Sequence, residues 1–95
     1  MGTVASGTSS SAEGRSTVAS GLTAHAEGMN SVASGDYSHA EGSDTSASGT
    51  YSHSEGRNTI ANDYSHSEGH KTSASGMYSH SEGRLTIAGG DYSHA

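Results

Sequence analysis

The sequence predicts an all-β fold: one domain, residues 1–95, forming a β-solenoid of about seven coils. Two observations lead to this prediction. A unit of 14 residues repeats along the whole chain, and only 28% of the 95 residues are hydrophobic, with no Phe, Trp, Pro or Cys. A chain so poor in large apolar side chains either stays disordered or gains its order from backbone hydrogen bonds. Because the repeat holds its register so well, we expect the second outcome.

The coils follow one another without a break. They span residues 3–16, 17–30, 31–44, 45–58, 59–71, 72–85 and 86–95, of which the fifth has 13 residues and the last is incomplete. Each coil divides into two similar sevens, as TVASGDY over SHAEGSD, in which five residues suit a short strand and Gly begins a corner. Coils about 4.8 Å apart would make a rod on the order of 33 Å long.

Glycine recurs in two columns, which we expect at the two corners of each coil. Tight corners require a positive φ, and glycine adopts it without steric cost. In the 13-residue coil Asn62 stands where Ser and Gly stand elsewhere, so we expect a tightened corner with a left-handed Asn there. The structural glycines are Gly21, Gly35, Gly49 and Gly76 in one column, and Gly28, Gly42, Gly56, Gly69 and Gly83 in the other.

Small residues occupy the centre of each predicted strand. Side chains alternate across a strand, so these residues point to one side and their neighbours to the other. With small residues on both strands, the two columns are expected to face each other across a thin interior. They are Ala19, Ala33, Ala47, Ala61 and Ala74 in one strand, and Ala26, Ala40, Ser54, Ser67 and Ser81 in the other.

Histidine and glutamate form two further columns, and the segment SHSE suggests a hydrolase triad. In an extended strand, however, Ser52 and His53 point to opposite faces, whereas a triad needs converging side chains. We therefore expect no catalytic residues and no enzyme. The columns are His25, His39, His53, His66, His80 and His94, with Glu27, Glu41, Glu55, Glu68 and Glu82.

The same histidines are candidate metal ligands, since nitrogen and oxygen donors about 5 Å apart suit zinc or nickel. The simpler interpretation, which we prefer, is a hydrogen-bonded ladder with no metal and no cofactor. Tyrosine forms another column, which we expect to stack at a corner and cover the interior, with a receptor platform as the alternative. It consists of Tyr37, Tyr51, Tyr64, Tyr78 and Tyr92.

The charge balance restricts the partners of the chain. A formal net charge of −6 with four basic residues argues against nucleic acid, which needs clustered cations. No apolar run is long enough to span a bilayer, so we expect no membrane insertion by this segment. The start MGTVASGTSS is not a signal peptide, so the segment either comes from a longer exported chain or acts without a signal of its own.

The motif ASGDYSHAEG at residues 33–42, with its copies, resembles the head repeats of YadA-like trimeric autotransporter adhesins, the Hep/Hag-type repeat. Related repeats occur in phage tail-fibre proteins. The resemblance covers residues 3–95 and implies a left-handed parallel β-roll and a homotrimer around a common axis. It also implies a place on the cell surface, outside the cell or in a virion fibre, and attachment to a host surface or extracellular-matrix molecule.

Two assignments of the strand at the trimer axis stay open. In the family an aliphatic strand seals the axis, and alignment on the Ser and the aromatic residue puts SHAEG there. Hydrophobicity favours the other strand, which carries Val18, Val32 and Ile60 but is interrupted by Ser46 and Ser73. We prefer the first, with hydrogen bonds between chains. The expected network comprises His39, Glu41, His53, Glu55, His66, Glu68, His80 and Glu82.

Two other functions remain as alternatives to attachment. In the first alternative the segment is an architectural spacer or a self-assembling filament unit. Filament assembly is conceivable because the open ends of a solenoid expose unpaired strands. A weaker alternative is an ice-binding surface formed by a column of Thr and Ser residues. The support for it is weak, because each coil contributes only one hydroxyl and no second Thr stands two residues further on. That column is Thr3, Thr17, Ser31, Thr45, Thr59, Thr72 and Thr86.

Overall fold

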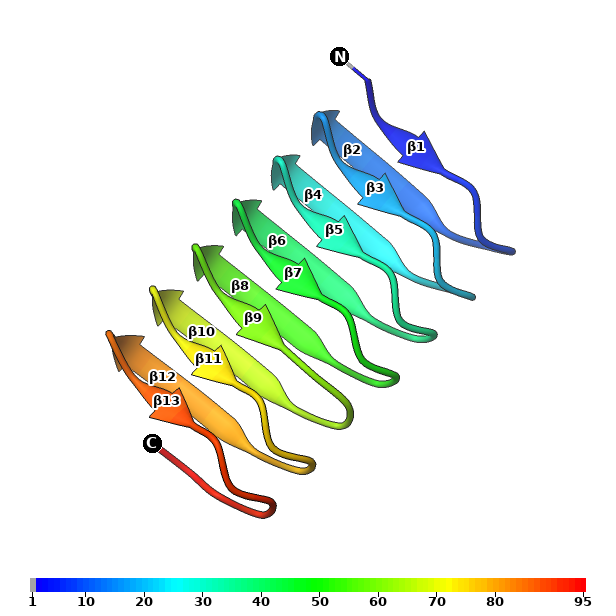
Figure 1. The fold of residues 1–95 in the computed structure, drawn as a ribbon. Coiled ribbons are helices and arrows are strands. Elements are labelled where there is room, and N and C mark those ends of the chain that lie inside the picture. The colour runs from blue at the N-terminus through cyan, green and yellow to red at the C-terminus, as the bar shows by residue number, and fades with distance from the viewer. Residues whose placement is uncertain (1) are drawn as a thin grey trace.

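The computed structural model describes residues 2–95 and consists of strands joined by tight turns, with no helix in that range. The coils stack into a parallel β-solenoid with N- and C-terminal ends at opposite ends of the stack (Figure 1). There are about six complete turns, and a bridge between His80 and His94 begins a seventh. The Cα atoms extend over 33 × 22 × 10 Å, so the predicted rod length and thin cross-section are confirmed.

Two parallel sheets form the faces of the solenoid, and each strand pairs in register with the equivalent strand of the next coil. The first sheet contains seven two-residue strands: β1 (Val4–Ala5), β3 (Val18–Ala19), β5 (Val32–Ala33), β7 (Ser46–Ala47), β9 (Ile60–Ala61), β11 (Ser73–Ala74) and β13 (Ile87–Ala88). The second contains six five-residue strands: β2 (Ser11–Arg15), β4 (His25–Met29), β6 (His39–Ser43), β8 (His53–Arg57), β10 (His66–His70) and β12 (His80–Arg84).

The two halves of a coil are therefore unequal, which corrects the prediction of two matching five-residue strands. In the first sheet the amides of Ser20 and Gly21 both donate to the Ala33 carbonyl. Two successive amides sharing one acceptor break the ladder, so the strand ends after its alanine. In the second sheet pairing continues through Gly28 to Met29, so this glycine lies within a strand and not at a corner.

Both glycine columns are crowded by the backbone of the next coil, but only one of them has a positive φ. Gly28, Gly42 and their column have φ between 107° and 117°, as predicted. Gly21 and Gly35 do not have positive φ, and the prediction for their column is wrong. They are glycines because an added Cβ at either would lie 2.0 Å from the carbonyl oxygen of the next coil's glycine. At Gly76 the distance to the equivalent oxygen, that of Gly90, is 2.2 Å, and at Gly49 the added Cβ would lie 2.1 Å from the Asp63 amide nitrogen of the shortened coil.

Non-glycine residues make the left-handed corners. Tyr37 has φ of 59° and Asn30 has φ of 54°, and the equivalent residues of the other coils behave alike. Asn62 lies outside the left-handed region, contrary to expectation. Its carbonyl accepts a hydrogen bond from the Ser65 amide at 3.1 Å, as the Gly21 carbonyl does from Ala24 at 3.3 Å. The corner of the 13-residue coil is thus shortened by one residue, as predicted.

Alanine fills the interior, which confirms the predicted core. The alanines of both columns from Ala19 to Ala74 are fully buried. Hydroxyls share this interior: Thr17, Thr45, Thr59 and the others between them are also buried. The ice-binding alternative loses its basis, because this threonine column faces the core and not the solvent.

Pairs of buried hydroxyls connect the two strands of a coil. The Oγ of Ser54 lies 2.6 Å from the Oγ1 of Thr59, and Ser67 and Thr72 are paired at 2.7 Å. Replacing Ser67 by alanine is expected to lower the free energy of unfolding by about 1 kcal/mol, because the buried Thr72 hydroxyl loses this partner. Urea unfolding followed by circular dichroism measures the change. Ser34→Ala, at an exposed position, is the control and should unfold like the unmodified chain.

The tyrosines stack, with ring centroids 4.9–5.4 Å apart, but they do not cover the interior. Their exposed fractions run from 42% at Tyr64 to 80% at Tyr92, because the left-handed corner turns them outward. Buried serines close the corner instead. Ser38 donates to the Gly35 carbonyl at 2.6 Å and Ser52 to that of Gly49 at 2.7 Å.

Candidate functional site

The face of the five-residue strands carries the histidine and glutamate columns. From β4 to β12 the second residue of each of these strands, an alanine or serine, is buried, so the first and third residues point outward. Parallel pairing in register then places His25 beside His39 and Glu27 beside Glu41. The result is a row of equivalent side chains along the solenoid, which we call the His–Glu row. It consists of His25, His39, His53, His66, His80 and His94 with Glu13, Glu27, Glu41, Glu55, Glu68 and Glu82.

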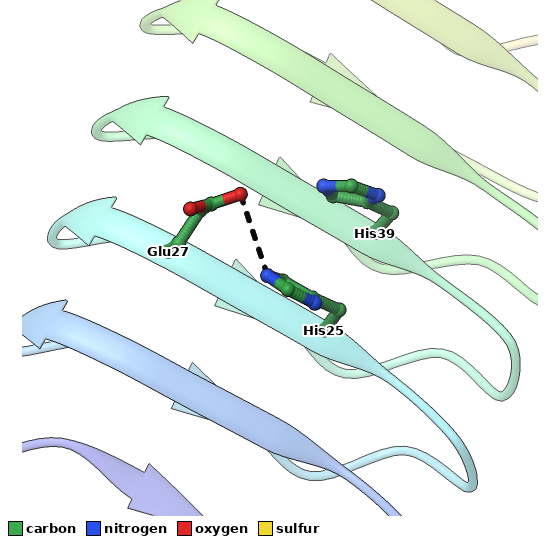
Figure 2. Close-up of side chains that lie close together, drawn as sticks. All are labelled: His25, Glu27 and His39. Atoms are coloured by element: carbon green, nitrogen blue, oxygen red, sulfur yellow. Dashed lines mark ion pairs between the residues drawn. The ribbon is translucent and has the colours of Figure 1, made fainter.

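Each glutamate reaches the histidine of its own strand. Figure 2 shows the Glu27 carboxylate beside the His25 ring, with His39 on the neighbouring strand; the Nε2 of His25 and the Oε1 of Glu27 are 3.4 Å apart. The same separation is 3.4–3.6 Å in the next four coils. From Glu41 onward each carboxylate also lies 3.8–4.0 Å from the Nε2 of the following coil's histidine. Every such carboxylate thus stands between two imidazoles.

The imidazole rings stack on one another. Ring centroids are 4.6–4.8 Å apart, and from His39 onward the planes differ by 2–6°; His25 and His39 are inclined by 27°. The side chains of His39 and His53 are 38% and 35% exposed. Their Nε2 atoms are nevertheless shielded from solvent, and within residues 2–95 they have no hydrogen-bond partner; His25, His66 and His80 are alike.

The environment favours neutral imidazole in the middle of the row. Partial burial lowers the pKa of His53, and positive charge on His66 or His39 would lower this pKa further. The carboxylates of Glu41 and Glu68 act in the opposite direction and raise it, but the first effects dominate. His53 is therefore neutral at pH 7, with its ring nitrogens able to accept a proton or an ion.

The structure brings the predicted His and Glu residues together, but along one chain. The SHSE residues do not converge as a triad: the Ser52 hydroxyl is buried and donates to Gly49, whereas His53 lies on the outer face beside Glu55. Glu13, which the sequence reasoning left out of the row, lies 4.0 Å from His25. The sequence did contain a signal for Glu13, because it precedes Glu27 by 14 residues, which is one repeat.

The opposite face carries the aliphatic column. Val18 and Val32 are half-buried, whereas Ile60 and Ile87 are 47% and 71% exposed. A hollow of about 380 Å³ lies nearby, where the shortened coil meets its neighbours. It is lined by Ser48, Gly49, Asn62, Asp63, Ser75, Met77 and Asp91. Residues 2–95 contain no helix that is long and apolar enough to cross a membrane.

Comparison with known proteins agrees with the repeat pattern. The YadA head domain repeat matches residues 12–38 in two copies. No curated protein sequence matches the chain. The matched segment contains β3, β4 and β5, and the same register of paired strands continues through the later coils. Residues 12–38 are therefore similar to YadA head repeats, and the later coils continue the same strand pairing.

Proposed function

We propose that the chain is a non-enzymatic attachment segment of a surface fibre, which presents a repetitive flank to a host-surface or extracellular-matrix molecule. The observation that carries this proposal is the YadA head repeat match within an unbroken stack of equivalent coils. Such a stack offers the same side chains again at every coil, so weak contacts to a repetitive partner add up along it. The segment would belong to a longer exported chain, on a cell surface or in a virion fibre.

The assembly that we propose is a homotrimer with the His–Glu row at the common axis. Five shielded Nε2 atoms without hydrogen-bond partners in residues 2–95 support this arrangement, because polar atoms removed from water need partners. Carboxylates of the two neighbouring chains would supply them through charge-assisted hydrogen bonds. The opposite face is less suitable as a seal, since Ser46 and Ser73 interrupt its aliphatic column.

Charge substitutions on the two faces test this assembly. Glu55→Lys is expected to convert the trimer to monomers, because three ammonium groups would meet near the axis in place of the carboxylates that join the chains. Ser46→Lys, on the opposite face, is the matched control and should remain trimeric. Sedimentation equilibrium gives the mass of each. A monomeric unmodified chain contradicts the trimer, and dissociation by Ser46→Lys alone places the other face at the axis.

Attachment itself is tested with beads that carry the purified chain. We expect these beads to adhere to immobilised extracellular-matrix proteins or to cultured host cells. Beads carrying heat-denatured chain, whose loss of fold is verified by circular dichroism, provide the control for nonspecific adhesion. If folded and unfolded chains adhere equally, the segment is an architectural spacer and the attachment proposal fails.

A further inference from the structure

We propose that the His–Glu row binds divalent transition-metal ions such as Zn²⁺, each held by two histidines of adjacent coils and the glutamate between them. The structure contains five overlapping groups of this composition, and in each group the three donor atoms lie within 4.8 Å of one another. The first group, His25, Glu27 and His39, is drawn in Figure 2. Each group lies within one chain, so the inference goes beyond the proposed function; it uses the same Nε2 atoms that the proposed trimer would bond between chains.

The distances within a coil already fit zinc. Two ligands at about 2.0–2.1 Å from a tetrahedral ion lie about 3.3–3.4 Å apart. The Nε2 and Oε1 atoms of His25 and Glu27, and of the equivalent pairs, are separated by 3.4–3.6 Å. From Glu41 onward the histidine of the following coil lies 3.8–4.0 Å from the same oxygen; in the first group the three donor atoms lie within 4.8 Å of one another. A small tilt of that ring completes three protein ligands, and water supplies the fourth position, which is a common zinc arrangement.

The donor nitrogens of the row are not engaged in hydrogen bonds by other groups in the described part of the chain. The Nε2 atoms of His25, His39, His53, His66 and His80 have no hydrogen-bond partner within residues 2–95, so binding an ion breaks no existing hydrogen bond there. The six carboxylates of the row supply negative charge that offsets the ions.

The stacking limits the number of ions. One Nε2 atom binds one ion, so a histidine cannot serve the groups above and below it together. Six histidines in a line therefore form at most three separate groups among the five that overlap. These are His25–Glu27–His39, His53–Glu55–His66 and His80–Glu82–His94. The expected capacity is thus three ions per chain, a number that depends on pairing between adjacent coils.

The test is calorimetric titration of the tag-free, EDTA-treated chain with ZnCl₂ at pH 7.5, with the mass of the protein measured in the same buffer. We expect three Zn²⁺ per chain and a higher melting temperature with zinc than without. Histidines are replaced by serine, because Ser11 occupies the same column in the first coil and the fold accommodates it. Circular dichroism verifies the fold of each variant.

Two double variants that each lose two histidines separate pairing from independent binding. His25→Ser/His39→Ser leaves two adjacent pairs, 53/66 and 80/94, and should bind two ions. His39→Ser/His80→Ser leaves one adjacent pair, 53/66, and should bind one. His70→Ser is the matched control with three ions expected, since His70 lies beside Arg57 and Arg84 and outside the row.

Several results would overturn the proposal. They are no zinc uptake, equal capacities of the two double variants, or loss of an ion in His70→Ser. Two ions per unmodified chain in a trimer would also overturn it, because that count means one ion per layer shared by three chains. A monomer that binds three ions supports the metal sites while contradicting the proposed trimer, so the two proposals fail separately.

Discussion

Replacing Gly35 by alanine is expected to lower the free energy of unfolding by about 3 kcal/mol or more. The new Cβ would lie 2.0 Å from the Gly49 carbonyl oxygen and 2.4 Å from its carbonyl carbon. The Gly49 carbonyl accepts the Ser52 hydroxyl within its own coil, and the adjacent Ser48 amide donates to Ala61 of the next coil, so neither atom moves away without disrupting this corner. Urea unfolding, followed by circular dichroism, measures the loss at a residue whose own φ is unremarkable.

Two other glycine variants separate close approach from backbone angle. Gly83 has φ of +112°, but its added Cβ would meet only Thr86 Cγ2 at 3.6 Å, so Gly83→Ala should cost about 1–3 kcal/mol through strain alone. Gly89 has neither a positive φ nor a contact closer than 3.6 Å, and Gly89→Ala should be near neutral. If Gly35→Ala proves no worse than Gly89→Ala, the close packing of the coils described above is wrong.

Enlarging the interior is the second large effect. Ala47→Leu should cost about 3 kcal/mol or more, because Ala47 is fully buried in a solenoid whose Cα atoms extend only 10 Å in its thinnest direction. The added atoms have no cavity to enter, so the two sheets must separate. Ala5→Leu is the matched control: Ala5 holds the same strand position in the first coil but is exposed. Thermal unfolding compares the two, and equal melting temperatures would contradict a core of alanine-sized residues.

The repeat alone was sufficient to predict the coils, their spacing and the alanine interior. These features follow from the 14-residue period and from the alternation of side chains between the two faces of a strand. Ala19 and Ala26, at the predicted inward positions, are fully buried. The histidine and glutamate columns were predicted on the same ground, because residues one repeat apart must stack when strands pair in register. The β-solenoid itself followed from the repeat, and the family resemblance added the parallel β-roll, whose parallel pairing the structure confirms.

The corners were not predictable from the residue types. Tyr37 and Tyr51 adopt left-handed angles that propensity assigns to glycine or asparagine, whereas Gly21 is required by its neighbour in the next coil and not by its own φ. Such constraints arise between coils and leave no mark in a single repeat. For the same reason the outward direction of the tyrosines and the pairing of Ser67 with Thr72 became visible only in three dimensions.

The candidate site was predictable in composition but not in geometry. The sequence places His53 and Glu55 on one face, yet it does not indicate that Glu41 of the preceding coil also approaches His53, at 4.0 Å. That contact depends on how far a glutamate side chain leans along the stack. The shielding of the Nε2 atoms likewise results from ring stacking, which residue spacing alone does not reveal.

The shortened coil shows where this architecture tolerates a change of length. Losing one residue at Asn62 leaves the pairing of β8 with β10 and of β9 with β11 in register, so the corner absorbs the deletion. Duplicating or removing a whole repeat would likewise introduce no new kind of contact and would change the reach of the fibre by about 4.8 Å. Unequal recombination between neighbouring repeats would therefore change the length of the solenoid, and the longer or shorter chains would adopt the same fold.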